Sequence, residues 1–157
     1  MVEIKKDIYI TRNTADCLNV IAYKRTKEEI ATYSQELYIE LKRRYRLLNK
    51  YGAAGEDSII HTVERVIGKT EAVVKIAEEL GLTIICENKC VNLYRNRKED
   101  INVMSLGELE NKCKLDGKRF NFHTVLVDEP TDAKRVRAIL NEISTRTFCP
   151  VNLLGVQ

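Results

Sequence analysis

Hydrophobic residues follow two different patterns along this chain. Between Lys27 and Lys50 they recur at spacings of three and four residues, which predicts one long amphipathic helix whose apolar face holds Ile30, Tyr33, Leu37, Leu41, Tyr45 and Leu48. The next segment, YGAAGEDS, contains two glycines and interrupts the pattern. We therefore predict a helical N-terminal extension over residues 1–57 that packs on the rest of the chain and includes a short strand at DIYI.

From residue 58 onwards, short apolar runs alternate with amphipathic segments. The runs have the length and composition of buried strands, and they are SIIHTV, GLTIIC, INVM, HTVLV and VNLLGV. Helices are expected near Lys69, after Ser105, which has capping-box spacing to Glu108, and from about Thr131 to Ile143. This alternation predicts an α/β domain over residues 58–157, with a mostly parallel sheet and flanking helices.

One tripeptide in this domain suggests phosphate binding. Gly68, Lys69 and Thr70 form the second half of the loop signature G-x-x-x-x-G-K-[ST], while Val63 stands where the first glycine is expected. Since G-K-[ST] occurs by chance in roughly one chain in fifteen of this length, its context must support the interpretation. It lies between a predicted strand and a predicted helix, where free backbone N–H groups and the helix dipole attract phosphate. Lys69 would neutralise phosphate charge, and Thr70 would bind magnesium.

A pair of acidic residues supplies a second candidate element. The apolar run HTVLV is followed directly by Asp128 and Glu129. At the carboxyl edge of a parallel sheet, residues that follow a strand face the ligand crevice. Asp128 would therefore hold magnesium, and Glu129 would serve as the catalytic base or would orient the attacking water. The alternative is that both acids simply begin the next helix, where negative charge is favourable.

Together, RVIGKT and VLVDE resemble the phosphate-loop (P-loop) NTPases that carry a catalytic glutamate. The segment ERVIGKT is similar to the deviant loop of phage terminase ATPases and helicase-like relatives, in which an arginine precedes the glycine by three residues, as Arg65 does here. The resemblance implies ATP and Mg²⁺ as cofactors and a phosphate contact from Arg65. It also implies that VNLLGV lies between the strand before the loop, SIIHTV, and the strand HTVLV, and that it ends in a phosphate sensor, for which Gln157 is the matching position.

Charge and cysteine content restrict the other interpretations. Net charge is only +3 with 31% charged residues, so the clusters KRRYR, YRNRK and KRVR, despite Tyr45 and Tyr94, favour solvated surfaces over a nucleic-acid site. No apolar run reaches membrane-spanning length, and the first residues lack the apolar centre of a signal peptide, so we predict a cytoplasmic protein without a membrane partner. Cys86 and Cys90 lack the further ligands of a zinc site.

These features predict a small ATP-binding protein, a slow Mg²⁺-dependent ATPase of phage or bacterial DNA metabolism. Because an arginine from outside the loop accelerates such reactions, we expect a second copy or another protein to supply one. Two alternatives stay open at this stage. The first is a nucleotide-binding regulatory module without hydrolysis, and the second is a DNA-binding or scaffold protein that uses no nucleotide.

Overall fold

The computed structural model describes residues 8–12, 19–23, 27–50, 52, 54–62, 68–98, 100–114, 123–129, 131–148 and 150–157. The main sheet in this part of the chain has five parallel strands in the order β3-β7-β6-β4-β5. They are β3 (Asp57–Ile60), β4 (Thr83–Cys86), β5 (Asn102–Ser105), β6 (Thr124–Val127) and β7 (Asn152–Val156). This sheet confirms the predicted α/β fold.

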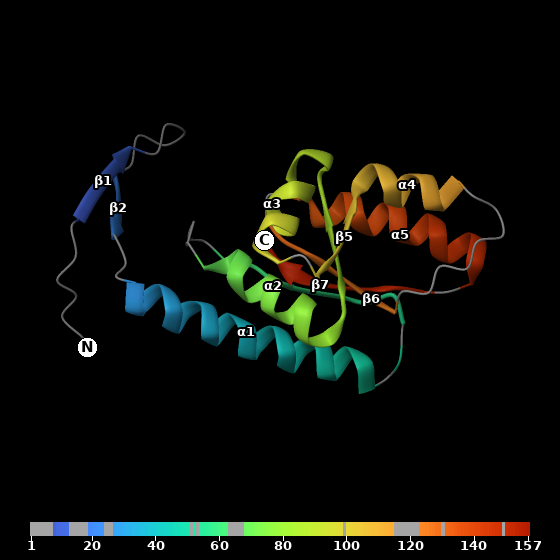
Figure 1. Ribbon diagram of the computed structural model, residues 1–157, viewed down its shortest axis with the longest axis horizontal. Helices are drawn as coiled ribbons and strands as arrows, with labels where there is room; N and C mark the ends of the chain where they lie inside the picture. The colour runs from blue at the N-terminus through green and yellow to red at the C-terminus, as the bar shows by residue number, and fades with distance from the viewer. Residues whose placement is uncertain are drawn as a thin grey trace.

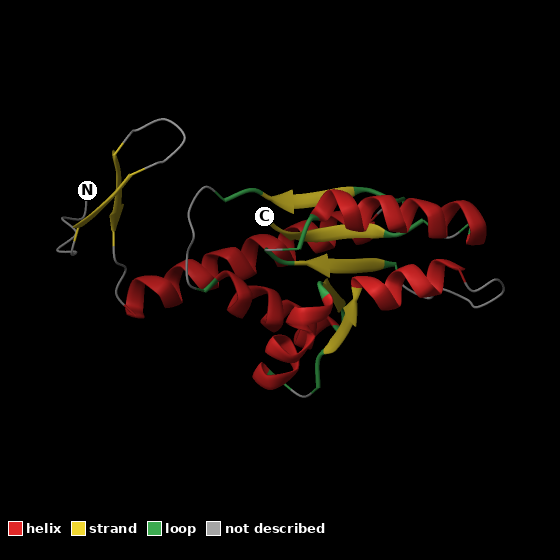
Figure 2. Ribbon diagram, turned by 90° about the horizontal axis from the view of Figure 1, so that it is seen from above, coloured by secondary structure: helices red, strands yellow, loops and turns green. Residues whose placement is uncertain are grey.

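Helices cover both faces of the sheet and give a three-layered structure (Figures 1 and 2). The helices α1 (Lys27–Lys50), α2 (Lys69–Leu80) and α3 (Val91–Arg97) pack on one face, and α4 (Leu106–Lys114) and α5 (Ala133–Thr147) on the other. Alternate residues of each strand enter the two hydrophobic cores. In β6, for example, Leu126 belongs to the α1–α3 core, while Val125 and Val127 belong to the α4–α5 core.

Most of the predicted elements agree with the structure. The helix predicted from Lys27 to Lys50 is α1, and all five strands predicted after residue 58 are present. The predicted cap of α4 is also present, because the Glu108 backbone N–H donates to Ser105 Oγ at 3.1 Å. By contrast, α5 extends four residues beyond the predicted end, to Thr147, and α3 with its preceding 3₁₀ turn (Asn88–Cys90) was not predicted.

The strand predicted at DIYI overlaps with β1 (Ile8–Arg12), which pairs with β2 (Asn19–Tyr23). The two strands are antiparallel and form a sheet of their own. The sequence patterns did not predict β2. The division of the chain into an extension over residues 1–57 and a domain over 58–157 stays a prediction.

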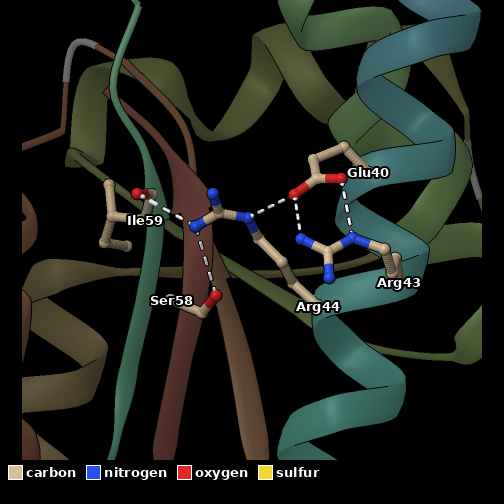
Figure 3. Close-up of polar contacts among 5 residues, drawn as sticks. All are labelled: Glu40, Arg43, Arg44, Ser58 and Ile59. Atoms are coloured by element: carbon tan, nitrogen blue, oxygen red, sulfur yellow. Dashed lines mark hydrogen bonds and ion pairs between the residues drawn. The ribbon is translucent and has the colours of Figure 1, made fainter.

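Helix α1 is attached to the sheet by both apolar and polar contacts. Leu37, Leu41 and Leu48 are buried in the core that α1 shares with α2 and α3. Figure 3 shows that Arg44 donates to the carbonyl of Ile59 on the edge strand β3, at 3.4 Å, and to Glu40 at 2.9 Å. Hydrogen bonds from Arg43 and Arg44 lower the pKa of Glu40 to about 2, so this carboxylate stays ionised at neutral pH. Within the basic segment KRRYR, Arg44 therefore links α1 to the edge strand of the sheet.

Gly155 allows β7 to lie close to β6. It is paired with Val127, and a Cβ atom at position 155 would overlap with the Val127 carbonyl oxygen and side chain. We expect Gly155→Ala to lower the free energy of unfolding by about 1–3 kcal/mol, because the strands would have to separate in a packed core. Urea denaturation measures this loss. Gly107→Ala is the matched control, since the added Cβ there approaches only the Asn88 side chain. Equal stability of the two variants would contradict the prediction.

Candidate functional site

The parallel sheet brings several strand ends and the start of α2 to one edge. Strands β3, β6 and β7 are adjacent and run in the same direction, so the residues that follow them gather there. Helix α2 begins at the same edge after Gly68, which has φ 114°, a value that favours glycine. A Cβ at Gly68 would lie 3.2 Å from Ile30 Cγ2 and 3.3 Å from the Ile30 carbonyl oxygen, so α1 borders the start of α2.

Lys69 and Glu129 form an ion pair across this edge. Lys69 Nζ donates to Glu129 Oε2 at 2.9 Å, although sixty residues separate them in the sequence. The two side chains differ in exposure, because that of Lys69 is 7% exposed and that of Glu129 is 45% exposed. A buried ammonium group is stable only with partners that compensate for its lost hydration. The Lys69 ammonium group is therefore largely dehydrated, whereas the carboxylate of its partner Glu129 can still reach solvent.

Asp128 lies at the end of β6 and is almost fully buried, with 1% exposure. Its Oδ2 atom accepts hydrogen bonds from Thr70 Oγ1 and from the Tyr94 hydroxyl, each at 2.9 Å. Its other oxygen, Oδ1, is buried and has no hydrogen-bond partner in the described part of the chain. Burial raises the pKa of Asp128, whereas the hydrogen bonds from Tyr94 and Thr70 act in the opposite direction. An added cation would satisfy Oδ1 and favour the ionised carboxylate.

Strand alternation explains why Asp128 points towards α2 and α3. Its neighbour Val127 packs into the core beneath α4 and α5. The next residue in an extended strand faces the opposite side. The carboxylate thus meets Thr70 on α2 and Tyr94 on α3.

Tyr94 is a site residue that the sequence interpretation missed. It is 4% exposed, and burial followed by the negative charge of Asp128 raises its pKa, so it stays a protonated donor. Its ring is buried in the core and is therefore not available to stack on nucleic-acid bases. The i, i+3 spacing of Val91 and Tyr94, both buried on α3, was the available signal for an inward-facing tyrosine.

Gln157 is held firmly at the end of β7 but contacts a different part of the edge. Its backbone N–H donates to Ile60 O at 2.9 Å, and its carbonyl accepts from Thr62 N at 2.8 Å. The side-chain amide donates to Thr131 O at 2.8 Å and accepts from Ala133 N at 3.3 Å. Gln157 therefore joins β3 to the start of α5. None of its recorded hydrogen bonds involves Lys69, Thr70, Asp128 or Glu129.

The loop arginine and the cysteine pair are the other residues that the sequence singled out. Arg65, together with Val63, belongs to residues 63–67, which lie outside the described part of the chain. Cys86 and Cys90 are free and buried, and burial raises the pKa of Cys86 to about 12. Within the described residues, no group of three or more His, Cys, Asp or Glu side chains is arranged to hold a metal ion. The two thiols pack in the core that includes α1, α2 and α3.

The basic clusters that suggested a nucleic-acid site are partly neutralised within the fold. In YRNRK, Arg97 pairs with Glu71 and Lys98 with Glu78. In KRVR, Arg135 pairs with Glu110, and Arg137 with Asp57. Internal ion pairs reduce the positive field that would attract a phosphate backbone. No helix in the described part of the chain is long and apolar enough to cross a membrane.

Comparisons with known protein families, curated proteins and solved structures found no match. Two hydrogen bonds join the start of α2 to the end of β6 in this site. Lys69 bonds to Glu129, and Thr70 bonds to Asp128, so these four predicted residues are connected in two pairs.

Proposed function

We propose that the chain binds ATP with Mg²⁺ at this edge of the sheet and hydrolyses it slowly, as a P-loop NTPase-like domain with a helical extension over residues 1–57. The observation that carries the proposal is the arrangement around Asp128. Its Oδ2 accepts a hydrogen bond from Thr70 at the start of α2, while its buried Oδ1 lacks a partner among the described residues. A carboxylate, a hydroxyl and substrate phosphates are typical Mg²⁺ ligands.

The start of α2 supplies the phosphate-binding groups. Gly68 has no side chain to cap the helix, so within the described part of the chain the first backbone N–H groups of α2 are available to another acceptor. Lys69 adds a positive charge directly at this end of the helix. A phosphate group bound here would replace part of the interaction that Lys69 now makes with Glu129. Arg65 would add a further contact, as the resemblance to the deviant loops implies.

Thr70 and Asp128 fit a magnesium ion through their oxygen atoms. Bound Mg²⁺ would supply positive charge that neutralises the phosphates and the charge developing during their transfer. Asp128 requires no rearrangement of its recorded hydrogen bonds to offer Oδ1, which has no partner among the residues that the structure describes. Thr70 can keep donating its proton to Asp128 while an oxygen lone pair faces the ion.

Glu129 would orient the attacking water. Its side chain is the more exposed of the two acids, so it can reach solvent molecules that the buried Asp128 cannot. In this structure it pairs with Lys69. When phosphate takes over Lys69, Glu129 becomes available as a general base. If Glu129 does not act as a base, the protein is a nucleotide-binding module without hydrolysis. The ion pair with Lys69 also supports this alternative, because it occupies the Glu129 carboxylate.

The strand order supports this class of protein. Strand β7 lies between β3, which precedes the loop, and β6, which precedes the two acids. The resemblance predicts this position for VNLLGV. In it, Gln157 would form a contact between β3 and the segment after Glu129. We place the activity in phage or bacterial DNA metabolism on the same resemblance. A second copy or another protein would supply the additional arginine, and the location would be cytoplasmic.

Isothermal titration calorimetry tests the proposal directly. We expect ATP to bind saturably in Mg²⁺, and more weakly in EDTA, because the metal ion joins the phosphates to Thr70 and Asp128. AMP serves as the control ligand, since it lacks the terminal phosphates. Absence of ATP binding in Mg²⁺, or equal affinity for ATP and AMP, would show that the edge is not a site for nucleoside triphosphates.

A further inference from the structure

We propose that Tyr94 is a positioning residue for the metal site, which it serves by holding the Asp128 carboxylate in place from α3. This inference rests on the proposed function, but no feature of the loop signature or the acidic pair includes a tyrosine. Tyr94 lies 34 residues before Asp128 in the sequence and donates its hydroxyl to Oδ2 at 2.9 Å.

Thr70 would have two roles in the proposed metal site. Asp128 has two recorded donors, and both act on Oδ2. One of them, Thr70, is itself expected to bind the ion, so its oxygen must satisfy two partners at once. Tyr94 is the other donor, and it needs no contact with metal or phosphate. Its hydrogen bond can therefore orient the carboxylate whether or not the ion is present.

The surroundings of Tyr94 make this orientation firm. Its ring is buried in the core formed by α1, α2 and α3, together with Val91 of the same helix. Asp128 is fixed from another direction by β6, which is paired on both sides by β4 and β7. Oδ2 is bound to Tyr94 and Thr70, and Oδ1 has no partner in the part of the chain that the structure describes, so Oδ1 is the oxygen left to bind a cation.

The chemistry resembles that of outer partners in other metal sites. Hydrogen bonds to a metal-binding side chain orient it, and their removal commonly weakens metal binding by about 10–100-fold. Phenylalanine at position 94 would keep the ring in the core but would remove the donor. Asp128 would then keep only the hydrogen bond from Thr70. The expected defect is in metal binding, and nucleotide binding without metal should be unaffected.

The test compares Tyr94→Phe with wild type in complex with a non-hydrolysable ATP analogue. Titration with Mg²⁺ gives the metal concentration at half-saturation, and titration of the analogue in EDTA gives its metal-independent affinity. We expect Tyr94→Phe to raise the half-saturating Mg²⁺ concentration by about tenfold or more, with an unchanged affinity in EDTA. Tyr45→Phe is the matched control, because Tyr45 packs against the same core from α1, and both of its values should equal those of wild type.

Two results would overturn the positioning role of Tyr94. The first is an unchanged Mg²⁺ requirement in folded Tyr94→Phe. The second is an equal loss of affinity in Mg²⁺ and in EDTA, which indicates a general packing defect. Failure of wild type itself to bind the analogue with Mg²⁺ would instead reject the proposed function.

If Tyr94→Phe does not fold, 3-fluorotyrosine placed at position 94 keeps the hydroxyl and reports on it by ¹⁹F NMR. A shift of this signal when Mg²⁺ joins the bound analogue is the expected result. A signal that is insensitive to Mg²⁺ would overturn the inference.

Discussion

Lys69→Ala is expected to lower ATP affinity at least about a hundredfold, which corresponds to roughly 2.7 kcal/mol of binding free energy. The reason is the position of Nζ at the start of α2, where it pairs with Glu129 and lies in a nearly buried environment. Charge-assisted contacts to phosphate are strong in such surroundings. Calorimetry with ATP and Mg²⁺ measures the loss, and circular dichroism checks the fold.

Two variants separate lost charge from lost packing. Lys69→Met keeps an unbranched apolar chain in the buried space but removes the ammonium group, so it should show the same loss as Lys69→Ala. Lys75→Ala is the control on the same helix, because Lys75 interacts with Gln35 and with the Tyr38 ring. Wild-type affinity in Lys69→Met would contradict a phosphate-binding role for Lys69.

Glu129→Gln is expected to reduce ATP turnover by about 10²–10⁴-fold, the usual contribution of a general base, while ATP still binds. Glutamine keeps the size of the side chain but cannot accept a proton from water. It also removes the ion pair with Lys69, so we expect nucleotide affinity to stay equal or to increase. Phosphate release measures turnover, and calorimetry measures binding.

Glu71→Gln is the matched control for this prediction. Glu71 follows Thr70 on α2 but is exposed and paired with Arg97, so its neutralisation should leave turnover unchanged. Equal turnover in wild type and Glu129→Gln would show that Glu129 is not the base.

A dilution series of the wild-type protein tests whether a second copy supplies the expected arginine. Specific activity rises with protein concentration if it does.

The fold was largely predictable because most of its elements have a strong local signal. In α1 the apolar residues recur with helical spacing over 24 residues, so its limits could be read directly from the sequence. Short buried strands such as β4 and β6 are continuous apolar runs next to turn or charged residues. Helix α3 has only seven residues and is mostly exposed, so it offers little periodicity.

The candidate site was predictable in part for a related reason. Lys69 and Thr70 belong to a short sequence signature, and Asp128 and Glu129 directly follow an apolar strand, so each pair was visible locally. Tyr94 has no such signature. It was interpreted as one of several aromatic residues near basic ones, because a single apolar spacing from Val91 on a seven-residue helix is a weak signal of which way the tyrosine faces.

The sequence by itself therefore determined which segments form strands and helices and which side chains carry suitable chemistry. Only the tertiary structure decided which of those side chains meet, because contacts across a sheet depend on strand order and on the face to which each residue points. The order β3-β7-β6 and the alternation along β6 bring Asp128 to Thr70 and Tyr94. The same alternation along β7 directs the Gln157 side chain to Thr131 and Ala133 at the start of α5, since it follows Val156, which faces α1–α3.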